Sequence, residues 1–550
     1  MSNLSKIRRD KMIEFLETLK EQHSDDESLI AINQIEKELV SKRYGLVWEE
    51  HEEAVDAMMR ENIPVFTEVK EREICMAPGE DYNFLLEGDN LHSLHLLEKT
   101  HKGKVDVIYI DPPYNTGGKD FVYNDVCIDR TDGYRHSKWL SFMYERLIIA
   151  KKLMSDIGLI FISIDDNEVA QLKLLCNEIF GEENFRGQIV RGTGTPTGQG
   201  NAILSNEIDY ILVYAKTQQA YFNGLPFDEE SSKIYNLEDE YGKYLNRPLR
   251  KTGGEDRRED RPSMFYPIEA PDGTDIYPIA PSGYESRWRC QKNTYEQLCK
   301  EHRIEWKRDK SGWKVYQKFY LEGRTKQPGN LWSNVEGNKK ATITIKNIMG
   351  TSIFSFPKPV EVIVRILQIA GNKGSVVLDF FAGSGTTAQA VLELNKEDGG
   401  QRKFILCTNN ENNICEEITY QRIKTVITGK RQDGSEYSEG IPANLKYYHT
   451  DFVPKNEEYL ADSMLKHVNE MIQLEHGVKI VDDSYIMIMS DDEADELEKK
   501  WSEYTDIKAI YVSQDVLLTA SQEVLFGSVD TYIIPDYYYN FELREAGELW

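Results

Sequence analysis

The chain has 550 residues, of which 40% are hydrophobic, and this is enough apolar material for several domain cores. No apolar run reaches the roughly 18 residues that a membrane helix needs, and the amino terminus lacks the apolar stretch of a secretory signal. We therefore expect a cytoplasmic protein without a membrane span. Seven cysteines, with no C-x-x-C pair, favour reduced thiols over a disulfide scaffold, and we expect no metal site.

The first 80 residues predict a helical arm. Residues 7–20 and 29–40 place apolar side chains at helical spacing, with charged residues between them. Such an arm is typical of oligomerisation or of packing against another element. A strand is predicted from Phe84 onward, and Asp89 follows it, where it can cap a helix that begins near Leu91.

The tetrapeptide Asp111-Pro112-Pro113-Tyr114 is the most informative segment, and we call it the elbow. It follows the apolar run 105–110, which predicts a buried parallel strand. The two prolines stop the strand and stiffen the backbone. A carboxylate, free carbonyls and an aromatic face at the carboxyl end of a strand suit a flat ring that bears an exocyclic amine. An ordinary strand-ending turn is the alternative.

Helix and strand patterns alternate as far as residue 216. Residues 138–154 and 168–180 predict helices, and residues 158–164 and 207–216 predict strands, a rhythm that favours a doubly wound sheet. Residues 191–206 are rich in Gly, Thr, Ser and Asn, and they predict a mobile loop beside the site.

Residues from about 220 to 350 lack this rhythm and carry four of the eight tryptophans. Basic residues adjoin these aromatics, as in Arg287-Trp288-Arg289, and this composition suits contacts to phosphates and bases. The alternative is that the tryptophans form the core of a small irregular domain. The distribution of charge fits contacts to phosphates. Residues 241–350 hold 22 basic and 14 acidic residues, whereas residues 451–550 hold 7 basic and 23 acidic residues. The net charge of −27 therefore does not exclude nucleic-acid binding by the insert.

A second strand, turn and helix follow the insert. Residues 357–371 first predict a helix that begins near Pro359 and stops at Gly371. Residues 375–381 then predict a buried strand, and residues 388–394 predict a helix.

The turn between that strand and helix is a glycine turn. Gly383 and Gly385 allow close backbone approach, and the helix start offers free N–H groups, as in the first unit of a Rossmann-type site. The spacing fits neither the dinucleotide fingerprint nor a Walker loop. A small polar loop beside an aromatic suits S-adenosylmethionine. The predicted cofactor-binding residues here are Asp379, Phe380, Phe381, Ala382, Gly383, Ser384, Gly385, Thr386 and Thr387.

Residues 403–407 predict the next strand, after which an acid should bind the ribose hydroxyls. The strand tip carries no acid, so we assign that role to Glu411, with Asn409 or Asn410 as substitutes. Further along the chain, four short strands predict a small α/β domain: residues 478–480, 485–489, 509–512 and 531–534.

The chain resembles the amino-DNA methyltransferases of the β group, and within it the modification (Mod) subunits of type III restriction–modification systems. The resemblance rests on the order of the elbow before the glycine turn, with a large insert between them. It also rests on longer matching strings, which are residues 109–123 (YIDPPYNTGGKDFVY), 136–143 (HSKWLSFM), 161–168 (FISIDDNE) and 209–216 (DYILVYAK).

The resemblance implies a Rossmann-like class I methyltransferase sheet with permuted motif order. It implies domains at 1–80 (helical arm), 81–218 (catalytic half), 219–350 (target recognition), 351–445 (cofactor half) and 446–550 (acidic α/β domain). It further implies that Asp89 contacts the adenosyl moiety, unless Asp89 only caps its helix. Ser355, Pro357 and Lys358 are then expected beside the methionine end of the cofactor.

The implied activity is methylation of adenine N6 in double-stranded DNA, with the target base flipped out of the helix. Asp111, Pro112, Pro113 and Tyr114 are the predicted catalytic residues. The absence of a Pro-Cys motif argues against cytosine C5 chemistry, whereas cytosine N4 presents the same amine and stays an alternative. The expected partners are a second copy of the chain and a helicase–nuclease (Res) subunit. A stand-alone enzyme, a protein or RNA methyltransferase and a non-catalytic DNA-recognition subunit are the remaining alternatives.

Overall fold

The computed structural model describes residues 4–548 except 24, 41–47, 119–120, 124–125, 195–206, 228, 311, 352–353, 355–356, 481–483 and 505–506. The chain divides into two compact units, Met1–Tyr221 with Gly329–Trp550, and Phe222–Pro328. The predicted target-recognition segment, 219–350, is therefore longer than the second unit. The roles given to the five predicted domains stay predictions.

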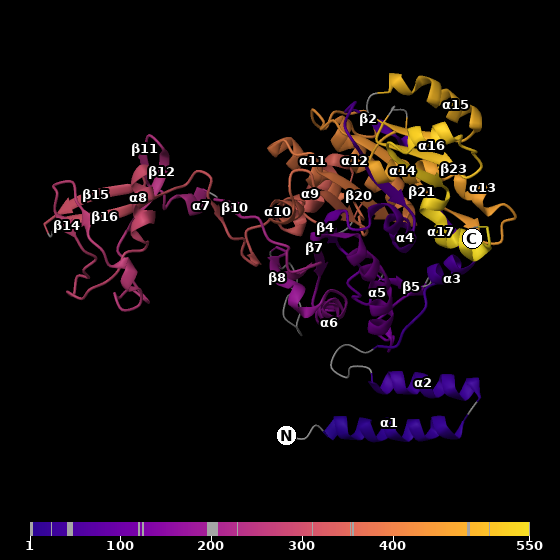
Figure 1. Ribbon diagram of the computed structural model, residues 1–550, viewed down its shortest axis with the longest axis horizontal. Coiled ribbons are helices and arrows are strands. Elements are labelled where there is room, and N and C mark those ends of the chain that lie inside the picture. Colours follow the sequence, from indigo (N-terminus) through magenta and orange to yellow (C-terminus); the bar gives the residue numbers. More distant parts are fainter. Residues whose placement is uncertain are drawn as a thin grey trace. The chain divides into compact units, whose positions relative to one another are not determined.

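One large mixed sheet forms the centre of the first unit (Figure 1). Its strands are parallel from β21 to β7, and β9 runs antiparallel to both of its neighbours. This order, with β9 reversed between β7 and β8, confirms the predicted class I methyltransferase sheet. The strands lie in the order β1 (Asn62–Glu68), β21 (Asn444–Pro454), β3 (Tyr82–Glu87), β20 (Lys403–Thr408), β19 (Val376–Asp379), β4 (Val105–Ile110), β7 (Met154–Ile164), β9 (Ile208–Ala215), β8 (Phe185–Gly192) and β18 (Leu331–Trp332), and β2 (Ile74–Cys75) pairs with β21.

Helices pack beside one another in two groups, as a doubly wound sheet requires. The first group is α4 (Asn90–His101), α5 (Arg135–Leu153) and α6 (Val169–Phe180). The second is α10 (Val360–Ala370), α11 (Thr386–Asp398) and α12 (Tyr420–Thr428), with α9 (Asn338–Met349) against α12. Helices α4, α5, α6, α10 and α11 confirm the predicted helical segments, whereas α9 and α12 were not predicted.

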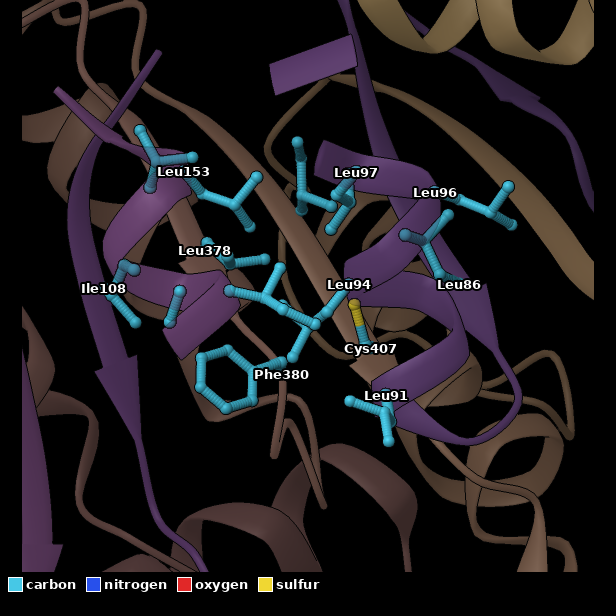
Figure 2. Close-up of a cluster of buried hydrophobic side chains, with 14 of the residues drawn as sticks. Leu86, Leu91, Leu94, Leu96, Leu97, Ile108, Leu153, Leu378, Phe380 and Cys407 are labelled. Carbon is cyan, nitrogen blue, oxygen red and sulfur yellow. The ribbon is translucent and has the colours of Figure 1, made fainter. Parts of the chain in front are cut away.

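Apolar side chains of α4 and α5 build one core with the inward residues of the central strands. Figure 2 shows leucines of α4 close to Leu378 of β19 and Cys407 of β20, and all of them are buried. Because β3, β20, β19 and β4 share this core, the carboxyl ends of those strands are held in fixed relation to one another.

The amino-terminal segment is only partly the predicted helical arm. Helices α1 (Leu4–Gln22) and α2 (Asp26–Val40) confirm the periodic pattern, and Lys20 pairs with Glu36 between them. Beyond α3 (Ala54–Glu61), however, β1 joins the central sheet antiparallel to β21. The expectation of helices up to residue 80 was wrong here, because the buried run from Ile63 to Phe66 completes a sheet edge that local periodicity does not reveal.

The second unit contains a four-stranded antiparallel sheet and a small core around Trp288. Of the four tryptophans in the predicted insert, Trp288 is buried here, whereas Trp332 is buried in the first unit. The sheet order is β11 (Leu237–Asp239), β12 (Gly242–Pro248), β16 (Gly312–Tyr320) and β15 (Ile304–Asp309), and α8 spans Lys292–Lys300. Shorter elements are β10 (Leu225–Pro226), α7 (Glu229–Ser232), β13 (Ile268–Glu269), β14 (Asp275–Ile276) and β17 (Thr325–Lys326).

The carboxyl-terminal region holds a three-stranded parallel sheet, which confirms three of the four predicted strands. The fourth, residues 478–480, was wrong, because these residues form the turn after the helix that ends at His476. No helix among the described residues is both long and apolar enough to span a membrane. The elements are α13 (Leu460–Leu465), α14 (Val468–His476), β22 (Tyr485–Ile488), α15 (Asp491–Lys500), β23 (Ala509–Ser513), α16 (Ala520–Phe526), β24 (Asp530–Ile534) and α17 (Asp536–Ala546).

Candidate active site

The elbow and the glycine turn lie next to each other, although they are far apart in the sequence. Strand β4 ends immediately before Asp111, and β19 ends at Asp379. The two strands are parallel neighbours in the sheet, with Val377 opposite Val107. Both loops therefore leave the same edge of the sheet, at the carboxyl ends where open α/β sheets bind ligands.

The elbow is held from within and from helix α5. The Tyr114 hydroxyl donates to Asp111 Oδ1 at 2.9 Å. The indole of Trp139, which is fully buried, donates from Nε1 to the Pro113 carbonyl at 2.8 Å. The Pro113 carbonyl is thus occupied, whereas the Pro112 carbonyl, one of the free carbonyls expected at the elbow, has no hydrogen-bond partner among the described residues.

Asn115, directly after the elbow, has a positive φ of 56°, a left-handed conformation that needs support outside glycine. Its Nδ2 donates to Glu168 Oε1 at 2.5 Å, and His136 Nδ1 lies 2.5 Å from the same oxygen. Burial raises the pKa of Glu168 to about 8 and lowers the pKa of His136. Both shifts favour the uncharged forms of the two side chains, whose contacts with each other and with Asn115 support the elbow.

Lys358 connects the elbow to the glycine turn. Its Nζ lies 2.7 Å from Asp111 Oδ1 and 2.6 Å from the Tyr114 hydroxyl. Its carbonyl accepts from Thr386 Oγ1 at 3.4 Å. Of the pocket residues predicted on this segment, Lys358 therefore reaches the site, whereas Ser355 lies outside the described residues.

A cavity of about 590 Å³ opens over the elbow, large enough for a nucleobase. One wall is the elbow itself, and the others come from β9, the start of α9, Lys358 and the residues that directly follow β7 and β8. The lining residues are Asp111, Pro112, Pro113, Tyr114, Thr116, Asp165, Thr193, Ile208, Asp209, Asn338 and Lys358.

The glycine turn has the backbone that its sequence predicts, with φ of 48° at Gly383 and 75° at Gly385. Asp379 is buried; it accepts from the Phe381 backbone N–H at 3.0 Å and from the Thr387 hydroxyl. Burial raises the pKa of Asp379 to about 7, and the nearby charge of Asp111 raises it further. Asp379 therefore ties the two ends of the turn together.

Arg422, on α12, supports the glycine turn through hydrogen bonds, and this role was not predicted from the sequence. Its guanidinium is buried and donates from Nη1 to the Ser384 hydroxyl at 3.0 Å and to the Thr386 hydroxyl at 2.8 Å. Its Nε and Nη2 both donate to Gln389 Oε1. Burial lowers its pKa to about 10, so the guanidinium stays charged at neutral pH. An arginine in an amphipathic helix gives no local signal of this role.

Asp89 and Glu411 take different positions. Asp89 accepts a hydrogen bond from the Leu91 backbone N–H at 2.8 Å. Asp89 therefore caps α4, which confirms the prediction of a helix cap. The next residue, Asn90, donates to the Phe380 carbonyl at 2.7 Å, which places this cap beside the glycine turn. Glu411 is exposed in a short 3-10 turn after β20. Both cofactor contacts stay predictions.

The groups around the glycine turn fit S-adenosylmethionine in their chemistry. Phe381 is partly exposed and offers an aromatic face for an adenine ring. The start of α11 offers backbone N–H groups for a carboxylate. The elbow, on the neighbouring strand, leaves the sheet beside this turn.

The sequence matches the family model described as DNA methylase over residues 105–421. The Mod subunit of the type III restriction-modification enzyme StyLTI from Salmonella typhimurium is 35% identical, with 69% of this chain and 62% of that protein covered. The EcoPI Mod subunit of Escherichia phage P1 is 36% identical, over 60% and 58%. The type II methyltransferase M.KpnI of Klebsiella pneumoniae is 37% identical, over 61% and 82%. The chain thus spans about three fifths of the length of the Mod subunits it matches.

Proposed function

The chain belongs to the DNA methylase family, and we propose that it is a site-specific DNA methyltransferase that acts on the N6 amine of adenine in double-stranded DNA. The observation that carries this proposal is the pairing of β4 with β19, because it sets an amine-binding elbow beside a nucleotide-binding turn. Relatives that are named as a type II methyltransferase and as type III Mod subunits support it.

The target base must leave the duplex to reach the cavity, at a cost of a few kcal/mol in stacking and pairing. Tyr114 offsets part of this cost by stacking on the base, which is worth about 1–3 kcal/mol. The cavity over the elbow holds the base. Polar groups that line the cavity replace the hydrogen bonds that the base loses when it leaves the duplex.

Asp111 and the Pro112 carbonyl accept hydrogen bonds from the two N–H groups of the amine and orient its nitrogen lone pair. S-adenosylmethionine, when bound at the glycine turn, supplies an activated methyl group. Lys358 and Tyr114 fix the Asp111 carboxylate through bonds of 2.7 and 2.9 Å, so the enzyme contributes positioning and electrostatics rather than a covalent nucleophile.

The second unit is proposed to recognise the DNA sequence. It belongs to a stretch with a basic excess, and Arg247, Arg287 and Arg289 lie close enough there for their charges to interact. Phosphate contacts from such residues would position the duplex, and other side chains would read base edges.

The chain is further proposed to act as the modification subunit of a type III system, with a helicase–nuclease subunit as its partner. The names of the relatives support the role of modification subunit.

The chain is also proposed to form a dimer with a second copy of itself. The helical hairpin α1–α2 supports the dimer, because it exposes Met12, Phe15, Ile30 and Ile35. Light scattering of the full chain beside a variant with Phe15→Lys and Ile30→Lys tests the dimer, which the variant should dissociate.

Methyl transfer from labelled S-adenosylmethionine tests the activity. The purified chain is incubated with duplex DNA, RNA or protein, and the labelled bases are separated after digestion. The proposal expects N6-methyladenine from duplex DNA and none with Asp111→Ala, which should still bind DNA. Label in N4-methylcytosine, RNA or protein would contradict it.

A further inference from the structure

Asn338, the first residue of α9, lines the cavity together with Asp111 and Tyr114. The sequence places it at the end of the predicted recognition segment, but it belongs to the unit that contains the elbow. Asn338 belongs to neither the elbow nor the glycine turn, and its side-chain amide has an unusual environment, a buried ion pair.

The orientation of the Asn338 amide is fixed by a buried ion pair. Arg191 and Asp209 are register partners on β8 and β9, 0% and 4% exposed, and Arg191 Nε donates to Asp209 Oδ1 at 2.8 Å. Arg191 Nη2 also donates to Asn338 Oδ1 at 2.9 Å. Because a guanidinium can only donate, the oxygen of the amide must face Arg191 and its nitrogen must face away.

The amide nitrogen therefore remains as a donor at the cavity wall. Neither N–H of Asn338 Nδ2 has a hydrogen-bond partner among the described residues. Of the charged groups that line the cavity, the carboxylates of Asp111, Asp165 and Asp209 only accept hydrogen bonds, and Lys358 directs two of its three N–H donors to the elbow. Among the described residues that line this cavity, Asn338 is the one whose side chain is a neutral amide. Its contact with Arg191 holds that amide in one orientation.

A base held by its amine on Asp111 presents acceptors to such a donor. In adenine, the ring nitrogens N1 and N7 lie on either side of the exocyclic amine, N1 bonded to the carbon that bears it and N7 one carbon further away, and both accept hydrogen bonds. Building on the proposed function, we propose that Asn338 Nδ2 donates a hydrogen bond to a ring nitrogen of the flipped adenine, and that Arg191 and Asp209 hold Asn338 for this purpose. Asn338 is then a specificity residue that contacts the substrate, and the other two are positioning residues.

The test combines protein variants with altered target bases. Once sequencing of modified DNA has given the recognition sequence, duplexes are made with adenine, 7-deazaadenine or 1-deazaadenine at the target position. Each analogue replaces one ring nitrogen by C–H and keeps the amine. The values of kcat/KM are measured for the wild-type chain, Asn338→Ala and Asn338→Asp. The aspartate keeps an oxygen for Arg191 but lacks the N–H donors.

The wild-type chain should lose about tenfold in kcat/KM on one of the two analogues, as one hydrogen bond predicts. Asn338→Ala and Asn338→Asp should show that loss already with adenine and no further loss on the same analogue. Asn334→Ala is the matched control, because Asn334 also accepts from an arginine, Arg365, but does not line the cavity, and it should behave as wild type.

Three results would overturn the inference. Variants of Asn338 that keep the wild-type sensitivity to both analogues would show that its amide does not contact the base. Full recovery of activity by Asn338→Asp would show that only the contact with Arg191 matters. A wild-type chain indifferent to both analogues would exclude a bond to either nitrogen. All three leave the proposed function intact, whereas failure of the wild-type chain to methylate adenine would refute the proposed function as well.

Discussion

Replacing Trp139 by phenylalanine tests whether the elbow depends on its contact with α5. The indole is fully buried, and its N–H donates to the Pro113 carbonyl at 2.8 Å. Phenylalanine keeps an aromatic ring but leaves that carbonyl without its donor, which costs about 1–3 kcal/mol. Because the carbonyl belongs to the elbow, this cost should appear in the activation free energy, and the rate of methyl transfer should fall about 5- to 160-fold.

The assay is single-turnover methyl transfer at saturating DNA and cofactor, with thermal unfolding measured alongside. The matched control is Trp288→Phe in the second unit, where a buried indole also donates to a backbone carbonyl, that of Tyr266, at 2.8 Å. Both variants should be less stable, but only Trp139→Phe should transfer methyl groups slowly once substrates are bound. A Trp139→Phe rate within about twofold of wild type would refute the proposed role of this contact.

Further predictions concern the glycine turn, the elbow and pH. Arg422→Met should raise the dissociation constant for S-adenosylmethionine at least about tenfold by loosening the turn, as calorimetry would measure. Arg402→Met removes a buried arginine that pairs with Asp398 at the end of α11, and it should leave that constant unchanged. Lys358→Met leaves Asp111 without the cation at 2.7 Å, so the single-turnover rate should fall about tenfold. Glu168, whose pKa is raised from 4.5 to about 8, favours the folded state most at low pH. This contribution should shrink as pH rises from 4.5 to 8, by up to about 1.4 kcal/mol per unit, and Glu168→Gln should remove that slope in urea unfolding.

Each of these expectations has a clear contrary result. An equal loss of cofactor affinity in Arg422→Met and Arg402→Met would point to general destabilisation. Wild-type rates in Lys358→Met would show that Asp111 needs no charge partner. An unchanged pH slope in Glu168→Gln would show that another group titrates in that range.

The sequence predicted those parts of the fold that depend on local pattern. Strands β4 and β19 follow from short apolar runs that end in prolines or glycines, and the helix stop at Gly371 follows from its composition. Strand β1 was missed because its pairing with β21, nearly 400 residues away, decides its conformation rather than its own pattern.

The site shows the same division between local and distant information. The elbow and the glycine turn carry backbone demands that their own residues reveal, so both were predicted. Of the residues that support them, Trp139 and Arg422 lie on helices and Glu168 directly precedes one, and their local sequences satisfy ordinary helical packing. Their hydrogen bonds to distant loops become visible only when the chain is folded.

The central claim is that the elbow and the glycine turn form one site for methyl transfer to adenine in DNA. Modification-aware sequencing of DNA from cells that express the wild-type chain or Asp111→Ala tests it most directly. The account predicts N6-methyladenine at one recurring sequence with the wild-type chain and at none with the variant. Unmodified adenine in both samples, or equal modification in both, would contradict it.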